Sequence, residues 1–291
     1  MSLATLLASD RKVIFLDGAM GTELGKAGLE MGGKANLSAP EAVFAIHQSY
    51  AACGIDMLIT NTFTMNRANI ESHGLDIDVR EVNLTGVRLA KQAALPGQYV
   101  LGDMSSAGKL LKPLGPLSEE EAFMAFKEQA GILAEAGVDG IIIETMFDLR
   151  EAVCAVKAVK EATSLLVIAS MAFNTAADGG RTVMGNRAAD CAVALVEAGA
   201  DVVGANCGSL DPHEMAQVIT LMREAVTVDI VAQPNAGKGR LVDKDLVFDM
   251  TAQAFAAGLK ECVSAGARLV GGCCGTSPEH IRAAVELIGR G

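Results

Sequence analysis

Two adjacent cysteines between glycines are the residues whose chemistry stands out first. Cys273 and Cys274 lie within residues 271–275, which read Gly-Gly-Cys-Cys-Gly. Neighbouring side chains of an extended strand point to opposite faces, so both sulfurs face one centre only where the backbone leaves strand geometry, as glycine permits. Converging thiolates are ligands for a soft metal ion, Zn²⁺ first. The alternative is that both cysteines are small buried hydrophobes, and a third sulfur is needed to decide.

Eight short apolar runs alternate with longer helical patterns along the chain. Their nearly continuous apolar character is typical of parallel strands that are buried on both faces. The predicted strands cover residues 13–17, 57–60, 99–103, 140–144, 166–170, 201–205, 229–232 and 268–271.

The segments between these runs carry helix signals at both ends. Ser38, Ser118 and Asp211 each precede a glutamate by three residues, and proline directly follows both Asp211 and Ser277, so all four residues predict helix starts. Glycines that close a helix immediately before a strand recur along the chain. They are Gly54, Gly137, Gly199 and Gly266. The repeated helix-glycine-strand unit predicts an α/β protein with a (β/α)₈ TIM barrel as its single domain, over residues 1–291.

Functional side chains of such a barrel lie where the strands end. Cys207 closes the sixth predicted strand, and Cys273 with Cys274 closes the eighth. Because alternate strands share a layer inside these barrels, the three sulfurs can meet at one point, and three thiolates leave a tetrahedral zinc ion with one open position. The other strand ends carry Asp17, Asn61, Asp103, Glu144, Asn206 and Asn235. The four remaining cysteines, Cys53, Cys154, Cys191 and Cys262, fall in helical patterns and are predicted to pack in the core.

These strand ends resemble the motifs of the homocysteine S-methyltransferase family, in order and over nearly the whole chain. Nearest is the homocysteine-binding module of cobalamin-dependent methionine synthase. The matching segments are residues 17–24, 60–63, 137–145, 206–207, 234–237 and 271–276. The resemblance implies one zinc ion per chain, held by Cys207, Cys273 and Cys274, with the substrate thiol completing the coordination. One departure lies near the barrel mouth, where residues 103–108 read Asp-Met-Ser-Ser-Ala-Gly and the family usually has Gly-Pro.

The resemblance also implies how the amino-acid end of homocysteine is held. Asp17 and Glu144 match positions that bind its amino group, whereas the alternatives are loop capping for Asp17 and a solvated strand end for Glu144. Gly18 and Ala19 could donate backbone N–H groups to the substrate carboxylate, or form only a tight turn. Asn206, and Asn235 likewise, could orient ligands and loops or serve simple turn chemistry.

The chemistry expected of this site is the activation of a thiol. A free thiol has a pKa near ~8.5 and is mostly protonated at neutral pH, whereas coordination to zinc leaves the sulfur deprotonated. The expected catalytic contribution is therefore to ionise and position the substrate sulfur, without a nucleophile from the protein.

Other motifs give no competing active site. His47, His73, His213 and His280 lie away from the strand ends and are predicted to be surface or helix-cap residues, which disfavours hydrolase triads and histidine zinc sites. Residues 237–240 read Gly-Lys-Gly-Arg but lack the spacing of a phosphate loop, so they are predicted to form a flexible or lid-like loop.

Composition limits the partners and the compartment. The 291 residues are 51% hydrophobic and carry a formal net charge of −11, which argues against nucleic acid or an anionic membrane as a partner. Seven cysteines are too few for a disulfide scaffold, the N-terminus lacks the basic segment of a secretory signal, and no apolar run reaches membrane-spanning length. These features predict a cytoplasmic protein with reduced thiols.

Three functions stay open from the sequence. The first is methylation of homocysteine to methionine. The second is a corrinoid-linked methyltransferase component of a demethylase system, which the altered 103–108 loop keeps open. The third is a metal-binding or redox-sensing barrel in which Cys273 and Cys274 respond to oxidants.

The donor predicted for the first function is methylcobalamin, presented by a corrinoid-binding protein or domain. Betaine carries a quaternary ammonium, which aromatic faces commonly bind. The chain has no tryptophan, and its two tyrosines, Tyr50 and Tyr99, are predicted to lie away from the open face. The chain also ends one helix after Cys274, so no extension is expected to build a donor pocket over the zinc. S-methylmethionine is the alternative donor.

Overall fold

Eight parallel strands form a barrel in a computed structural model that describes residues 2–242 and 245–289. Neighbouring strands follow the order β1, β10, β7, β6, β5, β4, β3 and β2. A parallel bridge between Leu16 and Met57 joins the two outer strands and completes the circle. The strands are β1 Ile14–Phe15, β2 Met57–Ile59, β3 Tyr99–Met104, β4 Gly140–Met146, β5 Leu166–Met171, β6 Val202–Asn206, β7 Asp229–Gln233 and β10 Leu269–Val270. Each lies within two residues of its predicted range, which confirms the single-domain TIM barrel.

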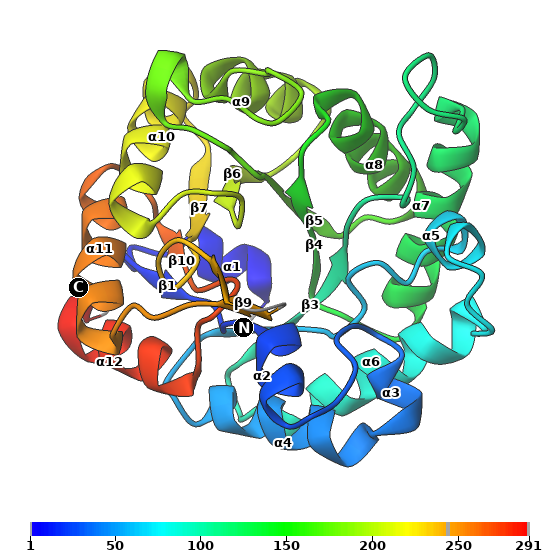
Figure 1. Cartoon of the computed structure of the whole chain (residues 1–291), viewed down its shortest axis with the longest axis horizontal. Helices are drawn as coiled ribbons and strands as arrows, with labels where there is room; N and C mark the ends of the chain where they lie inside the picture. Colours follow the sequence, from blue (N-terminus) through cyan, green and yellow to red (C-terminus); the bar gives the residue numbers. More distant parts are fainter. Residues whose placement is uncertain (1, 243–244, 290–291) are drawn as a thin grey trace.

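Helices surround the strands, and one short helix lies inside the ring (Figure 1). That helix is α1 Leu3–Leu7. The other helices are α2 Met20–Lys26, α3 Ala35–Ser38, α4 Pro40–Ala51, α5 Arg67–Ser72, α6 Val79–Ala93, α7 Glu119–Glu135, α8 Leu149–Ala162, the 3₁₀ turn η1 Ala177–Gly179, α9 Ala188–Glu197, α10 Pro212–Ala225, α11 Ala252–Ser264 and α12 Pro278–Ile288. In the described part of the chain, none of them is both long and apolar enough to cross a membrane.

All four predicted helices are present, and three of the four predicted capping residues are confirmed. Ser118 and Asp211 form capping boxes with the glutamates three residues later, and Ser277 begins α12 with Pro278 at the first helical position. Ser38 is wrong as a cap, because it is the last residue of α3 and its hydroxyl bonds back to the Lys34 carbonyl. The intervening Ala39 caps α4 without a side-chain bond, since the chain turns sharply there from one helix into the next.

The interior of the barrel is apolar toward its amino-terminal end. Leu3 and Leu6 of α1 pack there with strand residues such as Leu101, Ile142 and Val231, and all of these side chains are buried. A larger cluster fills the space between the strands and the helices, and it includes Cys53, Cys154, Cys191 and Cys262. Their burial confirms the packing role predicted for these four cysteines.

Two expectations about other segments need correction. His47 is fully buried in α4, and neither ring nitrogen has a hydrogen-bond partner among the described residues, so its predicted surface or cap role is wrong. Burial lowers the pKa of His47 to about 4, which keeps the ring neutral. The loop predicted over residues 237–240 covers only 237–239, because Arg240 begins β8 Arg240–Val242, which pairs antiparallel with β9 Asp245–Val247.

Candidate metal centre and substrate pocket

A strained turn at the end of β6 presents Cys207. Its backbone has a φ of 54°, and Gly208 follows with a φ of 70°, so the chain reverses over two left-handed residues. Only glycine fits at 208, since an added Cβ would come within 2.2 Å of the Phe173 carbonyl oxygen. The Cys207 amide donates a 3.1 Å hydrogen bond to the Gln233 carbonyl at the end of β7. The sixth strand thus ends with its thiol directed to the mouth of the barrel.

The loop after β10 holds the other two sulfurs. The amides of Gly272 and Cys273 donate to the carbonyls of Asp17 and Pro234, so the loop is held between the first and seventh strand ends. A Cβ at Gly271 would come within 2.7 Å of the Asp17 carbonyl oxygen, which explains why this approach requires glycine. The backbone leaves strand geometry after Val270, as the glycines predicted.

The three sulfurs of Cys207, Cys273 and Cys274 all lie within 4.8 Å of one another. The Cys207 and Cys274 Sγ atoms are 3.8 Å apart. Hydrogen bonds from Cys207 and then Cys273 lower the pKa of Cys274 to about 3, and the hydrogen bond with Cys207 contributes most to raising the pKa of Cys273. The three thiols therefore lie close enough to interact directly with one another at the mouth of the barrel.

This donor set has the chemistry and the size of a tetrahedral metal site. A tetrahedron with Zn–S bonds of about 2.3 Å has edges of about 3.8 Å, which matches the shortest S–S distance here. All three donors are soft thiols, and all three also line a pocket of about 420 Å³. The cluster could therefore hold a metal ion whose fourth position faces the pocket.

Acidic side chains line the same pocket. Glu144 lies at the end of β4 and Asp103 at the end of β3. Burial raises the pKa of Glu144 to about 7, the charge of Cys274 adds to this shift, and a hydrogen bond with Gln233 opposes it. None of the pocket-lining residues in the described part of the chain is Lys, Arg or His.

Glu144 belongs to an irregular end of β4. The pairing with β5 shifts register between Ile143 and Met146, and Thr145 has a φ of 59°. Asn206 secures this irregularity, because its Oδ1 accepts from the Thr145 amide at 2.8 Å and its Nδ2 donates to Thr145 Oγ1 at 2.7 Å. The same Nδ2 lies 3.8 Å from Cys273 Sγ. Asn206 does not line the pocket, so the structure places it as a support behind Glu144 and Cys273.

Asp17 lies just behind the pocket lining. It is 3% exposed, and its Oδ2 accepts a 2.9 Å hydrogen bond from the Ile59 amide. Its Oδ1 has no partner among the described residues. Burial raises the pKa of Asp17 well above its usual value, and the charge of Glu144 adds to the shift.

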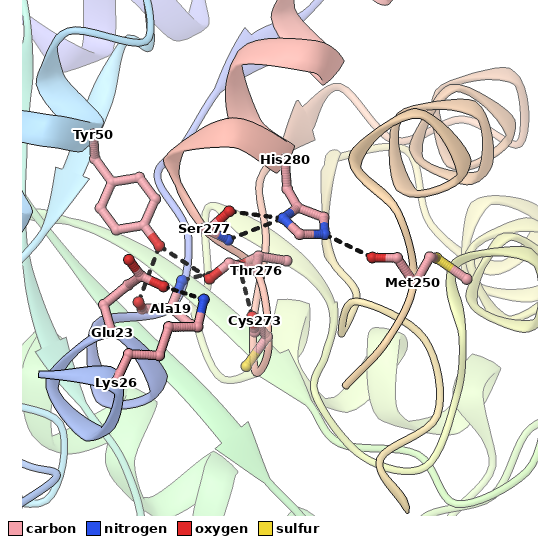
Figure 2. Close-up of polar contacts among 9 residues, drawn as sticks. All are labelled: Ala19, Glu23, Lys26, Tyr50, Met250, Cys273, Thr276, Ser277 and His280. Carbon is pink, nitrogen blue, oxygen red and sulfur yellow. Dashed lines mark hydrogen bonds and ion pairs between the residues drawn. The ribbon is translucent and has the colours of Figure 1, made fainter. Parts of the chain in front are cut away.

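The Gly18–Ala19 turn lines the pocket on the side of β1. The Ala19 amide donates to Thr276 Oγ1 at 3.0 Å, so this N–H is already engaged, while Gly18 has no room for a side chain beside Thr276 and Tyr50. The Tyr50 hydroxyl donates to the Ala19 carbonyl, as Figure 2 shows. Tyr50 was predicted to lie away from the open face. It is fully buried and absent from the lining, but its hydroxyl reaches the turn that forms the pocket wall.

Behind the cysteine loop, α12 is tied to the hairpin segment. His280 bonds to Ser277 through Nδ1 and to the Met250 carbonyl through Nε2, at 2.9 Å each (Figure 2). This confirms a helix-cap role for His280. Asn235 is a loop support as well, because its Nδ2 donates to the Gly208 carbonyl at 3.0 Å.

Several pocket residues had no assigned role in the sequence. Gln233 contacts Glu144, and its position directly after the predicted strand 229–232 was the available signal. Met20, Met31 and Phe63 supply apolar lining from the loops after β1 and β2, where sequence alone gives no signal of pocket-facing side chains.

Comparison with known proteins agrees with this geometry. A sequence model described as "Homocysteine S-methyltransferase" matches residues 14–288. The chain belongs to the homocysteine S-methyltransferase family.

Two of the similar proteins are a methionine synthase and a betaine–homocysteine S-methyltransferase. It is 28% identical to methionine synthase of Mycobacterium leprae over 298 residues, which cover 96% of this chain and 24% of that protein. It is 31% identical to betaine–homocysteine S-methyltransferase 1 of Bos taurus over 304 residues, which cover 94% of this chain and 72% of that protein. The chain thus spans about a quarter of the mycobacterial methionine synthase that it matches.

A solved structure with the same fold is the metallated form of the homocysteine methyltransferase MmuM from Escherichia coli. The TM-score is 0.79 at 22% sequence identity, and the match covers 98% of this chain and 99% of that one. At this identity the likeness supports the barrel fold of this family member.

Proposed function

We propose that the protein transfers a methyl group to the thiol of homocysteine and forms methionine, with zinc held by Cys207, Cys273 and Cys274. The observation that carries this proposal is the cluster of three sulfurs, all within 4.8 Å, at the wall of a pocket that also contains buried carboxylates. Family membership supports homocysteine as the methyl acceptor. The zinc ion would keep the substrate sulfur deprotonated at neutral pH and thereby nucleophilic.

The chain's own residues bind and orient the amino-acid end of the substrate. Glu144 and Asp17 accept hydrogen bonds from its ammonium, since Glu144 lines the pocket, Asp17 is buried just behind the lining, and no lining residue in the described part of the chain is positively charged. The Gly18 turn approaches the substrate carboxylate, with Tyr50 and Thr276 fixing the turn from behind. Asn206 keeps the strained Glu144–Thr145 segment in place.

The donor that we propose is a methyl-corrinoid on a partner protein or domain. With such a donor, the substrate sulfur would form its new bond to the methyl carbon, and the carbon–cobalt bond would break with its electron pair left on cobalt, while Cys207, Cys273 and Cys274 would hold the zinc that positions the sulfur. The thiol proton leaves to solvent when the substrate binds. Phe63 is the one aromatic side chain in the described pocket lining, which disfavours a quaternary ammonium held by an aromatic cage. Similarity to methionine synthases supports a corrinoid partner.

The test supplies zinc-loaded protein with homocysteine and one methyl donor at a time. The donors are methylcobalamin with and without a corrinoid-binding protein, S-methylmethionine, S-adenosylmethionine and betaine, and methionine is quantified. We expect methionine from methylcobalamin and none from betaine. Methionine from betaine, with none from methylcobalamin even when corrinoid protein is supplied, would contradict the proposed donor.

Two further outcomes would favour the alternatives. Methyl transfer from a methylated substrate to a corrinoid protein without any need for homocysteine would indicate the demethylase component. Zinc binding with no methyl transfer from any donor would indicate the metal-binding or redox-sensing barrel.

A further inference from the structure

A third buried carboxylate, Asp103, shares the pocket with Glu144 and the cysteines. It ends β3, it is 5% exposed, and it lies in the pocket lining. No role follows for it from the family resemblance, because Asp103 begins the segment that departs from the usual family sequence. Its backbone is held independently of its side chain, since the Asp103 amide donates to Thr60 Oγ1 and its carbonyl accepts from Thr62 Oγ1.

The Asp103 carboxylate is oriented but incompletely bonded. The backbone amide of Met104 bonds to it, while its Oδ1 is buried without a hydrogen-bond partner among the described residues. Asp17 shows the same arrangement, with Oδ2 bonded to the Ile59 amide and Oδ1 unpartnered. Burial, and then the charges of Glu144 and Asp17, raise the pKa of Asp103 well above its usual value. A buried unpaired carboxylate is costly, so the arrangement favours a ligand that brings positive charge and hydrogen-bond donors.

We propose that Asp103 is a specificity-determining residue that accepts the third N–H of the substrate ammonium, beside Asp17 and Glu144. This inference rests on the proposed function, since it concerns the ammonium of the same amino acid. A primary ammonium has three N–H donors. Asp103 and Glu144 line the pocket at the ends of β3 and β4, Asp17 follows β1 just behind the lining, and the charges of Glu144 and Asp17 both act on Asp103. The pocket is thereby selective for an unmodified amino acid over thiols that lack the amino group.

The first test compares two ligands that differ only in the amino group. Calorimetry on the zinc-loaded protein measures binding of homocysteine and of 4-mercaptobutanoate. Asp103→Asn is expected to weaken homocysteine binding about tenfold, because a charge-assisted hydrogen bond is lost. The same change should leave the binding of 4-mercaptobutanoate unchanged, since this ligand has no ammonium that could donate to Asp103. Asp76→Asn is the matched control, because Asp76 is exposed and lies outside the pocket.

Equal weakening of both ligands by Asp103→Asn, or no weakening of homocysteine, would overturn the inference alone. Wild-type protein that binds neither ligand would overturn the proposed function together with it. Circular dichroism of the variant establishes that it is folded.

A second test needs no variant. If three carboxylates share three N–H groups, N-methylhomocysteine should bind wild-type protein about tenfold more weakly than homocysteine, and N,N-dimethylhomocysteine more weakly still. Equal affinity for the three ligands would contradict a three-acceptor site.

Discussion

The two ends of the barrel interior differ in whether their polar groups have hydrogen-bond partners within the chain. At the amino-terminal end the interior is apolar, and the Arg268 side chain bonds to the carbonyls of Leu7 and Ser9 and to the Asp229 carboxylate. At the carboxyl-terminal end Asp17, Asp103 and Gln233 each have a buried oxygen without a described partner. One end therefore has its polar groups paired within the chain, whereas the other keeps them available to a ligand.

Backbone strain follows the same division. Cys207 and Thr145 are non-glycine residues with positive φ, and both lie at the mouth beside the sulfurs and Glu144. Strain of this kind persists only where neighbouring contacts hold it, which here are the Gln233 carbonyl and the Asn206 side chain. The amino-terminal end therefore stabilises the fold, whereas the strained residues at the mouth cost some stability and form the site in advance of ligand binding.

The strongest test of this division is the removal of one sulfur. Cys207→Ala should lower turnover by more than the roughly 100-fold typical of losing an outer partner of a metal ligand, and it should weaken zinc retention. The free energy of unfolding should stay close to that of the wild type, and chelation should leave the far-ultraviolet circular dichroism unchanged, because the barrel core does not depend on the ion. Cys191→Ala, a buried cysteine of α9, is the control and should keep its zinc. Full zinc content with normal activity in Cys207→Ala would contradict the assignment.

The second test shortens one side chain at the apolar, amino-terminal end of the barrel interior. Leu101→Ala removes a fully buried side chain from the barrel interior and should cost about 2–5 kcal/mol of unfolding free energy in urea denaturation. The folded fraction should keep its zinc content and its KM for homocysteine. Leu95→Ala, at a half-exposed position, should change stability by less than about 0.5 kcal/mol. A large KM change in Leu101→Ala would show that the two ends are coupled.

The sequence was sufficient to predict the barrel and the sulfur cluster. Continuous apolar runs that alternate with glycine-terminated helices have few other solutions, and Gly54, Gly137, Gly199 and Gly266 all have the positive φ that this pattern requires. Cys207 and Cys273 were brought together by topology alone, since the ends of parallel strands meet at one face of the barrel.

Residues whose role depends on the path of a loop were not predictable. Tyr50 reaches the Ala19 turn from α4, and His47 is buried with no hydrogen-bond partner among the described residues. The pKa of Asp103 depends on two acids from other parts of the chain, Glu144 and Asp17. Ser38 precedes a glutamate by three residues, as a capping residue does, but it is already the last residue of the preceding helix, α3. Local propensity describes neighbours in sequence, whereas these outcomes depend on neighbours in space.

A smaller effect is expected from the support behind the mouth. Asn206→Ala removes both bonds to Thr145 and the amide near Cys273, so zinc affinity or activity should fall about 10- to 100-fold, as measured by chelator competition and steady-state kinetics. Asn174→Ala, at an exposed site with one long bond to Ser209, is the control. Wild-type zinc affinity and kinetics in Asn206→Ala would show that the Glu144–Thr145 segment does not depend on hydrogen bonds from the Asn206 side chain.

The last predicted effect separates substrate binding from metal binding at the mouth itself. Glu144→Gln keeps the shape of the side chain but removes the negative charge that would pair with the ammonium, and a charge-assisted hydrogen bond is worth roughly 1.5–3 kcal/mol. The KM for homocysteine should therefore rise about tenfold or more, whereas zinc content should not change, since Glu144 is not one of the three sulfur donors. Glu286→Gln on the exposed face of α12 makes the same charge change away from the pocket. An unchanged KM would remove Glu144 from the ammonium site, and a loss of zinc would mean that this carboxylate acts on the sulfur cluster instead.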